Sequence, residues 1–340
     1  MRALLRLTVV ALSFGLGLLA VEYVLLRGAL RYHGIVDGEV FEHDDELGWK
    51  LQANVERPAS ELEFAITVRT DAMGLRTSGR TGEWRSASHR LLVAGDSFAF
   101  GWAVEGDQML SARLQDALAA RGLQTAVLNA GVPGYSTDQE YLLWRRLEPQ
   151  VRPDVVVLLL SANDPPADTA SSVAMSGAIY SKPFFQVTNG GLALMGVPVP
   201  DKQPLAASSL EPLKARLRPL ATFAVARRFN ATVRSPRQPE TVPTRAVAAD
   251  ALPVTAAILA AFNRDLRAQG GKLLVVLIPS PTVRDALAKI CGDEGIAFLD
   301  LGPAFEGHPD LIFKYDGHWN ARGHQAAADA VVTTLIRMLK

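Results

Sequence analysis

Hydrophobic and polar positions along this chain follow two alternating patterns. One is a short run that is apolar throughout, as in a parallel strand covered on both faces. The other has the spacing of an amphipathic helix. The apolar runs are Leu91–Ala94, Ala126–Leu128, Val155–Leu160, Leu273–Ile278 and Ala297–Leu299. The helical stretches between them are Met109–Ala120, a segment that Thr137 and Glu140 open as a capping box, Ala256–Gln269 and Thr282–Ile290. Regular alternation of this kind predicts an α/β fold with a doubly wound, five-stranded parallel sheet.

The amino terminus departs from this alternation. Leu7–Leu26 is apolar except for Glu22, and its twenty residues would span about 30 Å as a helix, enough to cross a membrane. The residues around Ala20 make a poor small-x-small cleavage site, so the pattern predicts an uncleaved signal anchor. A cleaved signal peptide and a buried helix remain alternatives. The short charged tail with Arg2 and Arg6 favours an amino terminus inside and an extracytoplasmic, periplasmic or extracellular, main domain.

Three segments follow from these patterns. Residues 1–31 form the anchor, residues 32–87 a β-rich flanking segment, and residues 88–340 the main domain. Residues 165–250 interrupt the alternation as an insertion or cap, which contains the basic helical stretch Leu210–Arg228. That stretch is either a cap helix with a solvated basic face or a lid that approaches anionic lipid headgroups or an acidic glycan.

Composition excludes several function classes. The formal net charge is zero and charged residues make up 21% of the chain, which argues against a nucleic-acid partner. The sequence contains no cysteine pair and no histidine–carboxylate motif for a metal site, and no glycine-rich loop for a nucleotide, so no metal and no cofactor are expected.

Polar residues gather where the apolar runs end. Ser97 follows the first run within Gly95-Asp96-Ser97-Phe98, and Asp316-Gly317-His318 lies near the carboxyl terminus. A serine needs a base to become a nucleophile, and the base needs a carboxylate to orient it, so Ser97, His318 and Asp316 predict a catalytic triad. Asp96 is expected to hold the loop rather than to act as the triad acid. Two further clusters, Asn129-Ala130-Gly131 and Ser161-Ala162-Asn163-Asp164, end the next two runs.

These four blocks resemble the SGNH hydrolases, the superfamily of GDSL-type esterases and lipases, in their membrane-anchored bacterial form. The resemblance covers about residues 88–340 and implies a flavodoxin-like sheet and an ester-hydrolysing triad. It assigns the oxyanion hole to the backbone N–H groups of Ser97 and Gly131 and to the side-chain amide of Asn163. A glycine would let the backbone approach the substrate closely. Two positions differ from the common pattern: Ser161 replaces a glycine, and only Gly317 separates Asp316 from His318. The shorter spacing is similar to the branch that includes polysaccharide O-acetylation proteins.

Three function classes follow from these observations. The first is an ester hydrolase that acts on acetyl or other short acyl esters, including those of a cell-envelope glycan. The second is an O-acyltransferase that moves an acetyl group to a polysaccharide hydroxyl, together with a membrane acyltransferase partner. The third is a catalytically idle carbohydrate-binding module, which an intact set of block residues disfavours.

Overall fold

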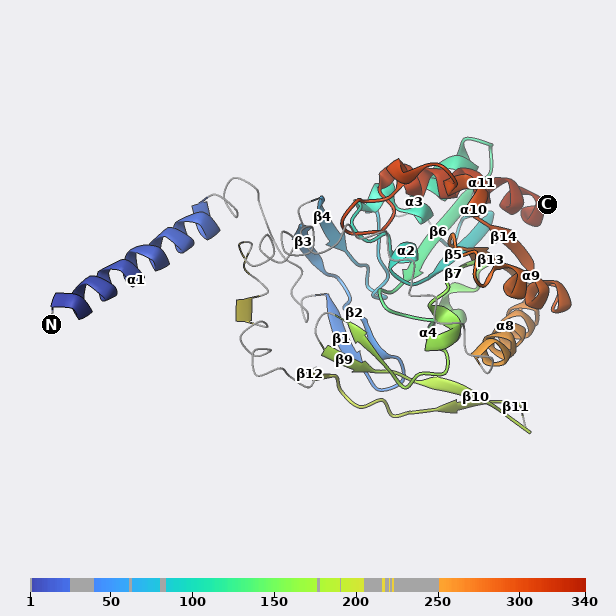
Figure 1. Ribbon diagram of the computed structural model, residues 1–340. Coiled ribbons are helices and arrows are strands. Elements are labelled where there is room, and N and C mark those ends of the chain that lie inside the picture. The colour runs from blue at the N-terminus through green and yellow to red at the C-terminus, as the bar shows by residue number, and fades with distance from the viewer. Residues whose placement is uncertain are drawn as a thin grey trace.

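The central sheet of this computed structural model has five parallel strands. Figure 1 shows the sheet with helices packed around it. The structure describes residues 2–24, 40–60, 63–79, 84–175, 178–189, 191–204, 216, 217, 220, 222 and 251–340. The strands are β5 (His89–Gly95), β6 (Thr125–Gly131), β7 (Val155–Leu160), β13 (Lys272–Leu277) and β14 (Ala297–Asp300). Their order in the sheet is β14-β13-β7-β5-β6, which is the flavodoxin-like order 2-1-3-4-5. The predicted doubly wound sheet is confirmed.

Helices cover both faces of this sheet. Successive residues of a strand point to opposite faces, so Leu91 and Val155 belong to one core while Leu92 and Val156 belong to the other. The longer helices are α3 (Leu110–Ala119), α4 (Thr137–Val151), α8 (Ala251–Arg267), α9 (Arg284–Asp293) and α11 (Ala321–Leu339). Side chains of α3 and α11 pack in the first core, and those of α4, α8 and α9 pack in the second. The short helices are α2 (Ser97–Phe100), α5 (Asp164–Ala167), α10 (Gly302–Phe305), η2 (Gly106–Gln108) and η3 (Pro309–Leu311).

The start of α4 differs from its prediction. Ser136 is the N-cap residue and Thr137 is already helical, and no side chain accepts a capping hydrogen bond. The Ser136 hydroxyl donates instead to Asp138 (2.8 Å), while Glu140 is buried with neither carboxylate oxygen bonded to a described residue. The predicted capping box of Thr137 and Glu140 is therefore wrong, because Thr137 lies one position beyond the cap.

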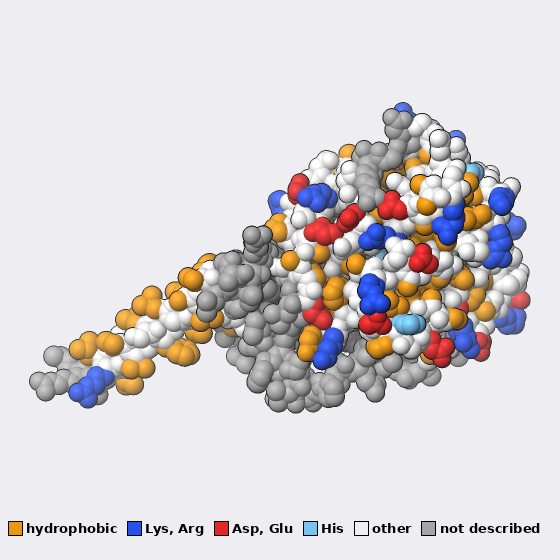
Figure 2. Space-filling view, turned by 90° about the horizontal axis from the view of Figure 1, so that it is seen from above, with side chains coloured by type: hydrophobic (Ala, Val, Ile, Leu, Met, Phe, Trp, Pro, Cys, Tyr) orange, Lys and Arg blue, Asp and Glu red, His pale blue; other side chains and the backbone are white. Residues whose placement is uncertain are grey.

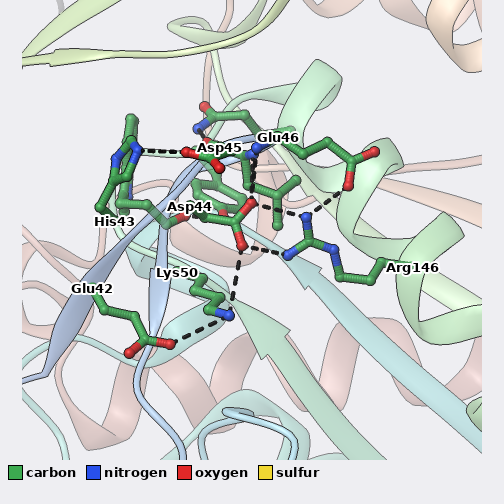
Figure 3. Close-up of polar contacts among 11 residues, drawn as sticks. Glu42, His43, Asp44, Asp45, Glu46, Lys50 and Arg146 are labelled. Carbon is green, nitrogen blue, oxygen red and sulfur yellow. Dashed lines mark hydrogen bonds and ion pairs between the residues drawn. The ribbon is translucent and has the colours of Figure 1, made fainter. Parts of the chain in front are cut away.

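Two antiparallel hairpins lie between the amino-terminal helix and the sheet: β1 (Phe41–Asp44) with β2 (Gly48–Leu51), and β3 (Glu56–Ser60) with β4 (Ala65–Arg69). Figure 3 shows how the first hairpin is fastened to α4: both terminal nitrogens of Arg146 donate to the carboxylate of Asp44, at 2.7 and 2.8 Å. Burial alone would raise the pKa of Asp44, but the hydrogen bonds from Arg146 and from the backbone hold it well below its ordinary value. Asp44 therefore pairs with Arg146 as a carboxylate.

The insertion contributes two small sheets. One has the order β12-β9-β8, and the other is the hairpin β10-β11. Their strands are β8 (Ser172–Met175), β9 (Ala178–Ser181), β10 (Phe184–Thr188), β11 (Gly191–Met195) and β12 (Gln203–Pro204). The buried ion pair between Lys182 and Asp138 joins the insertion to α4. Most of Leu210–Arg228 lies outside the described residues, so the cap helix predicted there stays a prediction.

The helix α1 (Arg2–Ala20) stands apart from the sheet domain in Figure 1, and Figure 2 shows apolar side chains over its surface. Leu5–Val24 is long and apolar enough to cross a membrane, and only 6% of that stretch is buried. A signal sequence near an amino terminus satisfies the same criteria. Glu22 does not stand unpaired, because its carboxylate accepts hydrogen bonds from the backbone N–H (2.8 Å) and hydroxyl (2.9 Å) of Thr222.

Candidate active site

The serine is presented by a strand that turns directly into a helix. β5 ends at Gly95, where φ is +146° and a Cβ would lie 2.8 Å from the Cβ of Ala99, so only glycine fits there. Asp96 then caps α2 by accepting the N–H of Phe98 at 2.8 Å, which confirms that it holds the loop. Ser97 is the first residue of α2 and lies just beyond the carboxyl end of the strand, where doubly wound sheets place their ligands.

The three predicted triad residues form one hydrogen-bonded chain. His318 Nε2 lies 2.7 Å from the Ser97 hydroxyl oxygen, and His318 Nδ1 lies 2.7 Å from Asp316 Oδ1. An ionised carboxylate only accepts hydrogen bonds, so Nδ1 carries the ring proton and Nε2 accepts the proton of Ser97. That tautomer is the one a general base needs. The His318 side chain is 24% exposed and that of Asp316 is 12% exposed, so the imidazole is nearer to solvent than the carboxylate that orients it.

Asp316 is held by partners that sequence reasoning missed. Trp102 Nε1 donates to Asp316 Oδ2 (3.2 Å), on the side opposite to His318. Burial would raise the pKa of Asp316, but the hydrogen bonds from His318 and Trp102 outweigh it and lower that pKa below its ordinary value. Glu63 accepts the backbone N–H of Asp316 at 2.9 Å. Neither Trp102 nor Glu63 belongs to a motif, and both are more than two hundred residues away in sequence.

Trp319, which follows His318 in sequence, belongs to an aromatic cluster with Phe98, whose ring also lies against His318. It is 1% exposed and its ring lies between Phe98 (centroids 5.0 Å apart) and Phe305 (4.9 Å). His324 packs edge-on against it, and burial lowers the pKa of His324 to about 3. A neutral imidazole buried in this way is a packing residue.

The predicted oxyanion donors are placed differently from one another. No acceptor for the backbone N–H of Ser97 or for the side-chain amide of the exposed Asn163 lies among the described residues, so both groups are free to bind a substrate oxygen. The N–H of Gly131 instead donates to the side-chain oxygen of Asn129 (2.9 Å). A Cβ on Gly131 would lie 2.1 Å from the backbone nitrogen of Phe100, so the group that approaches this glycine closely is helix α2.

A second glycine lies in the same turn. The N–H of Val132 donates to the carbonyl of Gly95 (3.0 Å), which holds the turn after β6 against the end of the serine's strand. Gly134 follows with φ +82°, and its N–H has no acceptor in the part of the chain that the structure describes. The oxyanion role predicted for Gly131 thus competes with an existing hydrogen bond, and Gly134 is a further donor that the sequence pattern did not single out.

Metal chemistry is not suggested by the side chains around the triad. Within the described ranges, no group of three or more His, Cys, Asp or Glu residues is arranged to hold a metal ion.

Comparison with known proteins places this architecture in a family. Residues 93–326 match the GDSL-like lipase/acylhydrolase family. An arylesterase from Vibrio mimicus is 35% identical over 78 residues, which are 23% of this chain and 39% of that relative. The matched stretch is therefore well under half of the relative's length.

Among solved structures, that of TesA is similar, with 17% identity and a TM-score of 0.44, covering 73% of this chain and 99% of that one. The psychrotrophic esterase EstA from Pseudoalteromonas sp. has 12% identity and a TM-score of 0.44, covering 74% and 99%. The family match spans all four sequence blocks and more than half of the chain, so the resemblance noted from those blocks is confirmed and the chain belongs to the GDSL-like lipase/acylhydrolase family.

Proposed function

We propose that this protein is a carboxylic ester hydrolase that passes through an acyl intermediate on Ser97. The observation that carries the proposal is the continuous hydrogen-bonded chain from Asp316 through His318 to Ser97, with both contacts at 2.7 Å. A serine bonded to a neutral imidazole that is itself held by a carboxylate is the arrangement that acyl transfer requires.

The reaction follows from these contacts. His318 Nε2 takes the hydroxyl proton while Ser97 Oγ attacks the ester carbonyl carbon. The resulting imidazolium is stabilised by Asp316 and returns the proton to the alkoxide that leaves, so the alcohol departs and acyl-Ser97 remains. Water then loses a proton to His318 and attacks the acyl carbon, which releases the carboxylic acid and restores Ser97.

The negative charge on the carbonyl oxygen needs preorganised donors, each worth about 3–4 kcal/mol in enzymes of this kind. The proposal gives this role to the N–H of Ser97 and the amide of Asn163, supported by the absence of competing acceptors among the described residues. A glycine N–H of the turn after β6 completes the set. Gly134 fits this part better than Gly131, since Gly131 already donates to Asn129.

The substrate class is a short acyl ester, with an acetylated cell-envelope glycan as the fuller form of the proposal. Helix α1 supports it, because an uncleaved anchor would hold the domain at the outer face of a membrane. In that position the enzyme meets envelope glycans, and a membrane acyltransferase that installs their acyl groups would be the natural partner.

A second candidate is transfer of the acyl group to a sugar hydroxyl. It rests on the phrase Asp316-Gly317-His318-Trp319, in which one residue separates aspartate from histidine. The side chain of Trp319 is buried in the core, so this part of the phrase is not exposed to contact an acceptor. A catalytically idle carbohydrate-binding module is disfavoured by the bonded triad.

The decisive experiment follows release of a chromogenic alcohol from an acetyl ester in buffer. We expect many turnovers per enzyme, little change on adding an oligosaccharide, and losses of about four orders of magnitude in Ser97→Ala and His318→Ala. Ser172→Ala, which alters an exposed serine of the insertion, is the matched control and should keep the wild-type rate.

Two outcomes would count against this function. Wild-type turnover in folded Ser97→Ala protein would remove the acyl-enzyme. A single burst equal to the enzyme concentration, with steady turnover only after a glycan is added, would favour transfer, because a transferase gains its rate from an oriented acceptor rather than from water.

A further inference from the structure

The loop that carries the triad aspartate is held by a residue outside the central sheet. Glu63, which precedes β4 in the amino-terminal segment, accepts three consecutive backbone N–H groups. One carboxylate oxygen accepts Lys314 (2.9 Å), and the other accepts Tyr315 (2.8 Å) and Asp316 (2.9 Å). Beside this contact, the rings of Phe64 and Phe313 lie 6.1 Å apart.

This arrangement meets a need of the loop itself. Residues 314–316 lie between η3 and α11 and have no strand or helix to receive their N–H groups. The loop is closed by Phe313 N–H to His318 O (2.8 Å) and Gly317 N–H to Phe313 O (3.1 Å), with Gly317 at φ +90°. Successive N–H groups that converge in this way form a concave anion-binding cradle, which an ionised carboxylate fills through charge-assisted hydrogen bonds.

The same segment also holds the end of the helix that begins at the triad serine. Arg76 is 2% exposed, and its guanidinium donates to the carbonyls of Phe100 (2.9 Å), Gly101 and Val104 (2.7 Å). Phe100 and Gly101 end the helix that begins at Ser97. Glu63 thus holds the loop that carries His318, and Arg76 holds the helix that begins at Ser97.

We propose that Glu63 is a positioning residue that sets the catalytic geometry of Asp316, and through it that of His318. The inference rests on the function proposed for Ser97. The backbone N–H of Asp316 donates to Glu63, and its carboxylate bonds His318 and Trp102. Asp316 therefore links the cradle to the imidazole. Loss of the carboxylate would free the loop and let Asp316 rotate away from Nδ1.

The test compares two substitutions that each remove one negative charge from the same hairpin. Glu63→Gln keeps the size of the side chain but leaves one oxygen for three donors. Glu56→Gln, the matched control, breaks an exposed ion pair with Arg69. In the full-length protein we expect Glu63→Gln to lower kcat about tenfold to hundredfold with KM within about threefold, because a small misplacement costs rate rather than binding. The Glu56→Gln variant should behave as wild type.

Coupling to Asp316 separates positioning from general stability. If Glu63 acts through Asp316, Glu63→Gln should cost much less in an Asp316→Asn background than in the wild type. Equal costs in both backgrounds, or a wild-type kcat for Glu63→Gln, would overturn the proposal.

A third measurement does not depend on ester hydrolysis. Hydrogen exchange at the amides of residues 314–316 should become at least tenfold faster in Glu63→Gln and stay unchanged in Glu56→Gln. Unchanged exchange in Glu63→Gln would show that Glu63 does not hold the loop, even if the enzyme is active. Faster exchange in a protein without esterase activity would support the hold of Glu63 on the loop and refute the proposed reaction.

Discussion

At the scale of single residues, the triad depends on how Asp316 is held. One oxygen faces His318 and the other accepts the indole N–H of Trp102 at 3.2 Å. A hydrogen bond to an ionised group contributes about 1.5–3 kcal/mol when it is well formed. The indole of Trp102 therefore holds the side chain of Asp316 in place, as we infer that Glu63 holds its backbone.

Trp102→Phe removes this donor and keeps an aromatic ring. We expect kcat/KM for a chromogenic acetyl ester to fall about tenfold, since the freed carboxylate oxygen would rotate towards water and orient the imidazole less well. Trp84→Phe is the control, because Trp84 Nε1 donates to the carbonyl of Val151 and has no part in the triad. Equal rates for the two variants would show that the Trp102 hydrogen bond contributes nothing to catalysis.

At the scale of elements, the start of α4 is unusual because it buries acids. Asp138 is paired with Lys182, but Glu140 has no hydrogen-bond partner among the described residues. Burial, together with the nearby carboxyls of Asp164 and Asp96, raises the pKa of Glu140 well above its ordinary value. Glu140 is therefore a neutral acid in the folded protein at pH values where the unfolded chain ionises it.

Glu140→Gln should reveal this pKa difference. The folded state keeps a proton that the unfolded state releases above about pH 4.3, so folding is penalised increasingly as pH rises, by at most about 1.4 kcal/mol per pH unit. Glutamine carries no ionisable proton, so the variant should gain stability relative to wild type between pH 5 and pH 8. Urea unfolding across this range measures the effect.

Glu148→Gln removes a carboxylate of the same helix that is paired with Arg152 instead of being buried alone, and it is the control for loss of a carboxylate from this helix. A stability difference between Glu140→Gln and wild type that stays constant with pH would mean that Glu140 is ionised in the fold.

At the scale of the whole molecule, the helix α1 has an apolar surface, whereas the sheet domain buries its apolar side chains in its own cores. The side chains of α1 are largely exposed, as Figure 2 shows, and so many apolar side chains on one helix favour a membrane over water. The sheet domain needs no such environment, because its two cores are closed by helices on both faces.

We expect the full-length protein to sediment with membranes and to resist extraction by salt or alkaline carbonate. A truncated chain that begins at Val40 keeps β1 whole and should be soluble with unchanged kcat, because Glu63, Arg76 and the triad all remain. Fractionation followed by an esterase assay checks both statements. Release of the full-length protein by carbonate, or a mature protein that lacks residues 1–26, would refute the anchor.

Periodicity and local motifs determined a large part of this protein. Fully apolar runs such as Val155–Leu160 predict buried parallel strands, because both faces of a doubly wound sheet are covered. Ser97, Asp316 and His318 were recognisable because each belongs to a short block whose chemistry depends on neighbours in sequence. The capping box failed because Ser136 is the N-cap residue, which leaves Glu140 one position beyond the place where a capping-box side chain acts, and its carboxyl is buried instead.

Only the tertiary structure decided how the site is supported. Glu63 and Trp102 bond Asp316 across more than two hundred residues, and Arg76 bonds the end of the helix that begins at Ser97. An ordinary acid, indole or guanidinium carries no local sequence signal of such a contact. Gly131 shows the same limit, since its missing Cβ makes room for Phe100 and its N–H is taken by Asn129. Spacing along the chain predicts which groups can react, whereas packing between distant segments determines which of their hydrogen bonds are already used.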